Sequence, residues 1–180
     1  MSPNVPLACL TLAAASLLAG CALLHPRKSF DQAIGHPPTL ALQGSIAPGA
    51  NADSVIPFDV VVARDKAMLK QISQMDAATW FGAKGRCAYR GGAKAKVQFH
   101  SWEFVPGQSF ALDVPLPADT RAVIGFADYD SAGEHRLLLP NSGSQFVEMG
   151  IDGIHASAGP SNSSPARPSA PEKQKVCPDD

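Results

Sequence analysis

The feature that most constrains the fold is a series of short apolar segments, separated by turn residues, between residues 39 and 154. The first segment, Thr39–Ile46, alternates between apolar and small or polar residues, and Pro57 opens a second segment with β-branched residues up to Val62. A period of two residues over such short lengths predicts half-buried strands. We expect about seven such strands at regular spacing, which predicts a mainly β fold built as a two-sheet antiparallel β-sandwich.

The strongest turn signal in the chain is Pro106-Gly107, with Pro and Gly in the order that a type II turn requires. The segments Val97–Val105 and Ser109–Val114 flank it, so we expect a β-hairpin here. The apolar residues of the first segment change face along its length: the two pairs are Val97 with Phe99, and Trp102 with Phe104. A bulge near His100-Ser101 would reconcile the two faces.

A short helical insertion is predicted after the second strand. Asp65 is suited to cap a helix whose apolar residues recur at helical spacing, namely Met68, Leu69, Ile72 and Met75. Asp76 is suited to cap a second short turn that carries Trp80 and Phe81. We expect Met68, Met75, Trp80 and Phe81 to pack into the core rather than to line a ligand site.

The C-terminal part continues the β pattern and then loses it. Arg121–Tyr129 is apolar on both faces, as expected of a central strand, His135–Leu139 follows a turn, and Gln145–Ile154 predicts a last strand or strand pair. From Ala156 to Pro171 the chain is almost entirely Ser, Pro, Ala and Gly, which cannot build a core. We therefore expect a β-sandwich domain over residues 39–155 and a disordered tail over residues 156–180.

The N-terminus carries an apolar run, Leu7–Gly20, that ends in small residues before Cys21. This run is too short to span a bilayer and is typical of a bacterial lipoprotein signal peptide over residues 1–20, with Cys21 as the acylated residue. An ordinary secretory signal or a buried N-terminal helix is the alternative interpretation. Residues 21–38 read as a linker, and Ala22 and Leu23 after the cysteine favour delivery to the outer membrane, facing the periplasm. Acyl chains (diacylglycerol and palmitate) are the only membrane attachment that we expect.

The two remaining cysteines are Cys87 and Cys177, because Cys9 would leave with the signal peptide. An oxidising compartment permits a Cys87–Cys177 disulfide that would pin the tail to the domain, although two unpaired thiols fit the sequence as well. The sequence has no CxxC pair or Cys/His cluster, so we expect no metal site.

The formal net charge is −1, which gives no reason to expect nucleic-acid binding. One segment, Gly82–Lys96, is locally basic and contains no acidic residue. Such a segment could meet anionic headgroups or an acidic partner, but a solvated connecting loop is the favoured interpretation.

Catalytic motifs are missing from the sequence, which has no nucleophile elbow, zinc-protease motif, phosphate loop or dinucleotide fingerprint. His100 with Glu103, or His135 with Asp128 and Asp130, are the pairs that could act as base and orienting carboxylate. A single histidine in a strand or turn is usually structural, so we expect neither an enzyme nor a cofactor. The acidic residues around Tyr129 are too few for a cation site and are explained by a turn.

Several motifs follow one another in a recognisable order. The signal peptide ending at Cys21 precedes a strand, the loop Asn51-Ala52-Asp53, and the β-branched strand that Pro57 opens. Then come Glu103 just before the Pro-Gly turn, and an apolar strand with a Tyr followed by a strand carrying Arg136. In this order the chain resembles the type VI secretion outer-membrane lipoproteins of the SciN or TssJ family.

The resemblance implies a transthyretin-like sandwich with an inserted helical segment and no enzymatic activity. It also implies a structural adaptor that links the outer membrane to the periplasmic domain of an inner-membrane secretion subunit. The partner contact is implied to lie in the loop Pro48–Ile56, with Asn51, Asp53 and the adjoining Pro57 as partner-binding residues, although Asn and Asp also form turns unaided. A secretin pilotin or a toxin-immunity protein is the alternative function, and a periplasmic hydrolase is disfavoured by the missing motifs.

Overall fold

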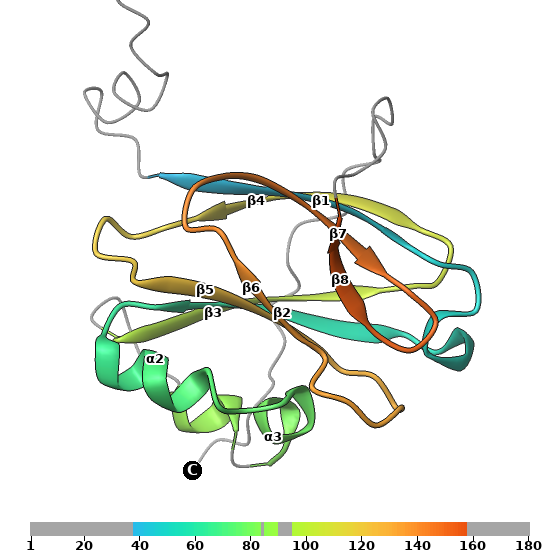
Figure 1. Ribbon diagram of the computed structural model, residues 1–180, viewed down its shortest axis with the longest axis horizontal. Helices are drawn as coiled ribbons and strands as arrows, with labels where there is room; N and C mark the ends of the chain where they lie inside the picture. Colours follow the sequence, from blue (N-terminus) through green and yellow to red (C-terminus); the bar gives the residue numbers. More distant parts are fainter. Residues whose placement is uncertain (1–37, 84, 90–94, 158–180) are drawn as a thin grey trace, which may run out of the picture.

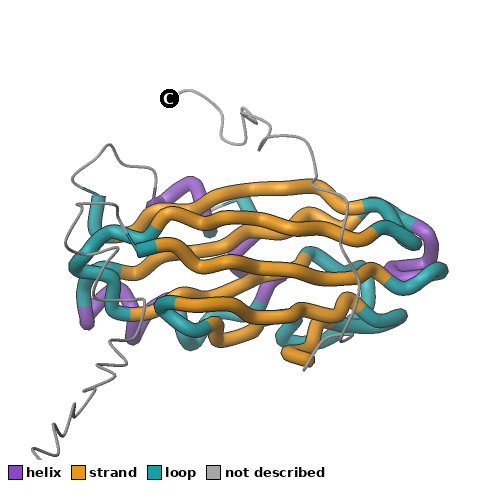
Figure 2. Tube along the Cα trace, turned by 90° about the horizontal axis from the view of Figure 1, so that it is seen from above, coloured by secondary structure: helices purple, strands orange, loops and turns teal. Residues whose placement is uncertain are grey.

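The computed structural model describes residues 38–83, 85–89 and 95–157, which form a sandwich of two four-stranded sheets (Figures 1 and 2). Sheet A has the strand order β4-β1-β7-β8, and sheet B has the order β3-β2-β5-β6. The predicted mainly β, two-sheet architecture is therefore confirmed. The predicted signal peptide, the acylation site Cys21, and all but the last residue of the linker lie outside the described residues, as does Cys177.

The connections between the strands contain the helical elements of the described residues, and the longest of them joins β2 to β3. The strands are β1 Thr39–Ile46, β2 Ile56–Ala63, β3 Val97–Phe104, β4 Ser109–Pro115, β5 Ala122–Ala127, β6 Arg136–Leu139, β7 Gly143–Met149 and β8 Ile154–Ser157. The helical elements are the 3-10 helix η1 Ala50–Asp53, the α-helices α2 Lys66–Ile72 and α3 Ala77–Phe81, and the 3-10 helix η2 Arg86–Tyr89.

Strand β1 lies inside sheet A, between β4 and β7, and has one antiparallel and one parallel neighbour. It is antiparallel to β4, with Leu40 opposite Val114, and parallel to β7, with Leu40 opposite Gly143. The expectation of a wholly antiparallel sandwich is thus wrong for one pair. Because five strands, the four of sheet B and β4, lie between β1 and β7 in the chain, no tight turn forces this pair to be antiparallel.

The turn at Pro106-Gly107 forms, but the predicted hairpin does not. Gly107 has φ +83°, and the N–H of Gln108 donates to Val105 O (3.3 Å), as the turn signal predicted. The strands on either side nevertheless enter different sheets, because β3 pairs with β2 and β4 pairs with β1. The end of β1 holds the turn between the sheets, since Gly107 N–H donates to Ile46 O (3.0 Å).

The bulge predicted in β3 is also absent. The strand pairs with β2 without interruption, from Val97 opposite Ala63 to Phe104 opposite Ile56. Its apolar residues change face because sheet B is covered on both sides. Val97 and Phe99 contact the hydrophobic cluster under the helices, whereas Trp102 and Phe104 belong to the core between the sheets.

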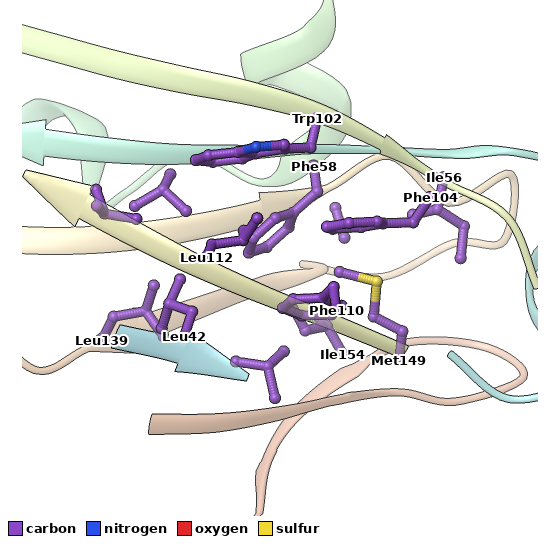
Figure 3. Close-up of a cluster of buried hydrophobic side chains, with 14 of the residues drawn as sticks. Leu42, Ile56, Phe58, Trp102, Phe104, Phe110, Leu112, Leu139, Met149 and Ile154 are labelled. Carbon is purple, nitrogen blue, oxygen red and sulfur yellow. The ribbon is translucent and has the colours of Figure 1, made fainter. Parts of the chain in front are cut away.

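The core between the sheets is rich in aromatic and branched side chains (Figure 3). Phe104 from sheet B stacks on Phe110 from sheet A at 4.4 Å between ring centroids, and Phe58 lies within 6.4 Å of Phe110. Leu42 and Met149 contribute from sheet A and are fully buried. Burying each side chain of this size stabilises the fold by roughly 1.5–3 kcal/mol.

A second, smaller core lies between the outer face of sheet B and the helices, which form a separate layer in Figure 1. The predicted caps are confirmed: Asp65 accepts from the N–H groups of Ala67 and Met68, and Asp76 accepts from that of Thr79. Trp80 is fully buried and stacks on Phe126 of β5 at 5.3 Å. Met68, Met75 and Phe81 pack against the same cluster, so the core-packing prediction for the helical segment is confirmed.

Candidate docking surface at one end of the sandwich

Four loops gather at one end of the sandwich. Because β1, β3, β5 and β7 all run toward this end, the connections that follow them lie there, at the right of Figure 1. We call residues 47–55, 105–108, 128–135 and 150–153 the loop end. Backbone hydrogen bonds extend the strand pairing of each sheet into these loops. In sheet A, Ala47 N–H donates to Met149 O (2.8 Å), and in sheet B, Asp128 N–H donates to Pro57 O (2.9 Å).

The β1–β2 loop has an unusual backbone. Gly49 at φ +80° is followed by Asn51, Ala52 and Asp53 at φ +50°, +51° and +62°, so most of η1 is left-handed. Residues other than Gly, Asn and Asp strongly disfavour this conformation, because their Cβ atom approaches the following carbonyl oxygen. Ala52 therefore carries backbone strain that the surrounding contacts must offset.

Asn51 provides these contacts and points inward, with only 5 % of its surface exposed. Its Oδ1 accepts from the N–H of Asp130 (2.7 Å), and its Nδ2 donates to Val55 O (3.3 Å). Its backbone N–H donates to Ile151 O (3.0 Å). The residue therefore joins three of the four loops at once.

The other two predicted contact residues lie nearby. Asp53 is exposed on η1, and Pro57 is half-buried near the start of β2. The structure thus brings Asn51, Asp53 and Pro57 to the same end of the molecule, but of these three only Asp53 is exposed.

Tyr129 is a functional candidate that sequence reasoning missed. Its hydroxyl lies within hydrogen-bonding distance of two carbonyl oxygens of the β7–β8 loop, those of Gly150 (3.0 Å) and Gly153 (3.1 Å). Its ring stacks on His135 (4.9 Å), and burial raises the pKa of Tyr129 to about 12. The phenol therefore stays neutral at physiological pH and can donate to the loop. The sequence signal was a Tyr two residues after a segment that is apolar on both faces.

The surface of the loop end combines apolar and acidic side chains. Val55, Val105 and Ile151 are large apolar residues with exposed fractions of 47 %, 46 % and 52 %. Val55 precedes Ile56 and Val105 follows Phe104, and Ile56 and Phe104 are paired across β2 and β3, so the two valines lie at the same end of these strands. The Ile151 side chain reaches the β1–β2 loop, because its Cδ1 would lie 3.6 Å from a Cβ placed on Gly49. The acidic residues of the four loops are Asp53, Asp128, Asp130, Glu134 and Asp152, and the same loops contain no Lys or Arg.

The histidine pairs considered for catalysis are arranged differently. His100 lies on the same face of β3 as Trp102, and the two rings stack with their centroids 6.1 Å apart. Because side chains alternate along a strand, Glu103 lies on the opposite face from His100. Nε2 of His135 lies 2.8 Å from Ser131 O, a carbonyl that can only accept, so this nitrogen carries a proton in that contact. Within residues 38–83, 85–89 and 95–157, no group of three or more His, Cys, Asp or Glu residues is placed to hold a metal ion.

A buried charge cluster under the helices was also missed by the sequence reasoning. Asp59, in the middle of β2, is fully buried, accepts from Trp80 Nε1 (2.8 Å) and lies 3.5 Å from a guanidinium nitrogen of Arg86. Asp59 Oδ1 and the Nη1 atom of Arg86 have no hydrogen-bond partner in the described part of the chain. Burial raises the pKa of the nearby Asp128, an effect that the charge of Arg86 partly opposes. The sequence signal that could have revealed this cluster was Asp59, an acidic residue inside a strand of β-branched residues.

Part of the positive charge of the basic segment Gly82–Lys96 is paired with acidic side chains. Arg86 faces Asp59 and lies over the Phe81 ring (5.0 Å), while Lys96 pairs with Asp65 (3.5 Å). These contacts favour a connecting and covering role for the described part of Gly82–Lys96. Cys87 is half-buried in η2; its predicted partner, Cys177, lies outside the described residues, so the disulfide stays a prediction.

Among the described residues, none forms a helix that is both long and apolar enough to cross a membrane.

The fold and the loop end define a class of protein: a two-sheet β-sandwich with a helical layer on one outer face and interlocked loops at one end. No family model and no curated protein matches the sequence. Solved structures do match the fold. One is Serratia marcescens Lip, a membrane-bound component of the type VI secretion system, with 16 % identity and a TM-score of 0.51, over 67 % of this chain and 98 % of Lip.

Two further matches have the same character. One is a structure described as a type VI membrane complex (14 % identity, TM-score 0.54), in which the match spans 68 % of this chain and 99 % of the matched chain. The other is a structure described as the C-terminal domain of the type VI secretion protein TssM from EAEC (14 % identity, TM-score 0.50, 68 % and 99 %). The predicted resemblance is thus confirmed at the level of the fold, which is that of type VI secretion lipoproteins of the TssJ type.

Proposed function

We propose that this protein is a lipid-anchored, non-enzymatic adaptor of a type VI secretion membrane complex. In this proposal, acyl chains on Cys21 hold it at the periplasmic face of the outer membrane. The loop end binds the periplasmic domain of an inner-membrane core subunit. The observation that carries the proposal is the match of the whole sandwich to a membrane-bound type VI secretion component over nearly all of that protein's length.

The direction of the strands supports this arrangement. The first described strand, β1, begins at Thr39, at the end of the sandwich opposite the loop end (Figure 1). A strand of 8 residues is about 26 Å long at about 3.3 Å per residue. The chain therefore enters the sandwich at the end opposite the loop end, so an anchor that precedes Thr39 is not attached at the proposed contact surface.

The surface chemistry supports a protein partner of defined character. Exposed apolar side chains near one another mark protein interaction sites, and Val55, Val105 and Ile151 supply them here. Because the loop end carries acidic residues and no basic ones, we expect a partner surface with apolar side chains surrounded by Lys and Arg. The match to a structure described as a TssM domain supports an inner-membrane subunit as this partner.

A binding measurement with matched variants tests the proposal. The full chain is purified in detergent and titrated against the periplasmic segment of the inner-membrane type VI secretion subunit from the same genome. We expect micromolar or tighter affinity, and a loss of tenfold or more when Val55 and Ile151 are both replaced by Ser. Leu138→Ser is the control, because Leu138 is 72 % exposed but lies on the edge strand β6, away from the loop end.

Two outcomes would contradict the proposal. Absence of binding by the well-folded wild-type chain would reject the adaptor function and favour a pilotin or a toxin-immunity protein. An equal loss of affinity in Leu138→Ser and in the double variant would reject the loop end as the contact surface.

The anchor has a separate test. Cys21→Ser should move the protein from the membrane pellet to the soluble periplasmic fraction, because the acyl chains are its proposed attachment. Continued pelleting of this variant with outer membranes would contradict lipid anchoring.

A further inference from the structure

We propose that Asn51 and Tyr129 are positioning residues, which hold the loop end in its binding conformation without contacting the partner. This inference rests on the proposed function and deepens it, because it separates the residues that touch the partner from those that set the loops. Asp53, Val55 and Ile151 are exposed and available for contact, whereas Asn51 and Tyr129 are buried.

The first step of the argument is that the β1–β2 loop cannot keep its shape by local preference alone. Asn51, Ala52 and Asp53 are consecutive residues in the left-handed region, and isolated chains visit this region only at single residues. A loop of this shape therefore needs contacts from outside itself. Asn at position 51 tolerates the backbone and also offers both a donor and an acceptor.

The second step is the identity of the groups that Asn51 binds. Its Nδ2 donates to the carbonyl of Val55 (3.3 Å), and its backbone N–H donates to the carbonyl of Ile151 (3.0 Å). These are two of the three exposed apolar residues of the loop end. A single buried residue thus fixes the backbone from which both contact side chains project.

The third step is that Tyr129 links the β5–β6 loop to the β7–β8 loop. Asn51 Oδ1 accepts from Asp130 N–H (2.7 Å), which ties the β1–β2 loop to the β5–β6 loop. The Tyr129 hydroxyl then ties the β5–β6 loop to Gly150 and Gly153 of the β7–β8 loop. Three loops are therefore joined pairwise, and none can move without breaking a hydrogen bond to another.

A surface held in this way binds its partner without a cost for ordering the loops. Without the Asn51 side chain, Val55 and Ile151 remain present, but the β1–β2 loop loses its side-chain ties to Val55 O and Asp130 N–H, so the spacing of the two contact residues is set less firmly before the encounter. The loss of affinity should appear mainly as a more unfavourable entropy of binding.

The experiment compares Asn51→Gly with Asn141→Gly in the full chain. Glycine at position 51 keeps the left-handed backbone accessible and retains the backbone N–H that donates to Ile151 O, so the variant removes only the side-chain hydrogen bonds to Asp130 N–H and Val55 O. Asn141 is an exposed residue in the β6–β7 turn at the opposite end, so it controls for the substitution itself. Hydrogen exchange of the Asp130 N–H should accelerate at least tenfold in Asn51→Gly and be unchanged in Asn141→Gly, with exchange in the middle of β2 unchanged in both.

The binding arm uses the same periplasmic partner segment and isothermal titration calorimetry. We expect Asn51→Gly to weaken affinity about tenfold, through entropy, at a temperature well below unfolding. Tyr129→Phe, which removes one oxygen atom, should weaken binding in the same direction, with Tyr89→Phe as its control. Tyr129→Phe also provides the test if Asn51→Gly does not fold.

The possible failures are distinguishable. A wild-type chain that does not bind rejects the proposed function and this inference with it. Wild-type affinity in both Asn51→Gly and Tyr129→Phe, with a wild-type chain that binds, rejects the positioning role alone. Unchanged exchange of the Asp130 N–H in Asn51→Gly also overturns it, because the loop would then be held by other contacts.

Discussion

The buried pair of Asp59 and Arg86 allows a quantitative prediction. The side chain of Asp59 is 1 % exposed and that of Arg86 is 16 % exposed, so solvent screens their interaction weakly. Arg86→Met keeps most of the side-chain volume over the Phe81 ring but removes the positive charge. The Asp59 carboxylate then keeps Trp80 Nε1 as its hydrogen-bond donor.

The expected magnitude follows from this geometry. Removing one partner of a buried ion pair costs about 3–5 kcal/mol, because the other charge stays buried and uncompensated. The pair is 3.5 Å apart and lacks hydrogen-bond geometry, so we expect a value at the low end, about 3 kcal/mol. Asp59→Asn in the Arg86→Met background removes the remaining charge and still offers Trp80 an acceptor. This double variant should regain about 2 kcal/mol.

Urea unfolding followed by far-UV circular dichroism measures the free energies of the wild type, the two single variants and the double variant. All four chains are compared in the same oxidation state, because Arg86 adjoins Cys87. A loss below about 1 kcal/mol in Arg86→Met would refute the reasoning, as would a double variant that loses the sum of the two single losses.

Three other predictions concern single features. Burial lowers the pKa of His100 below its ordinary 6.5, so the stability it contributes is complete above that pH and is lost as pH falls toward the folded-state pKa. His100→Gln should flatten the pH dependence of stability between pH 7 and 5, and an unchanged slope would contradict this assignment. Ala52→Val should lower the free energy of unfolding by about 1–3 kcal/mol because position 52 is left-handed, whereas Ala52→Gly should not, and equal effects would argue against strain. Peptide mapping without reduction should recover Cys87 linked to Cys177, and alkylation of Cys87 without prior reduction would contradict the disulfide.

Local features of the chain were predictable because their physics is local. The alternation of Thr39–Ile46 depends only on the two-residue period of a strand, and the structure places β1 over those residues. Asp65 and Asp76 were recognisable as caps because a short carboxylate satisfies N–H groups only two or three residues away. The resemblance to a secretion lipoprotein family likewise came from the order of such local motifs.

The features that the sequence did not predict depend on contacts between distant residues. The Pro106-Gly107 turn reverses the chain, but the pairing of β4 with β1 decides that the reversal crosses from one sheet to the other. The face change in β3 looked like a bulge because the sequence does not say that a helical layer covers the outside of sheet B. Strand pairing and layer packing are non-local, and a single strand carries no signal of its neighbours.

The same distinction applies to the candidate site. The sequence by itself placed Asn51 and Asp53 in one exposed-looking loop and offered the same role for both, because both residue types favour turns. The tertiary structure separated them: a backbone N–H from Asp130, 79 positions along the chain, draws Asn51 inward, and Asp53 remains outside. Local composition thus determined that a turn forms here, and only the meeting of three distant loops decided which of its side chains is buried and which is exposed.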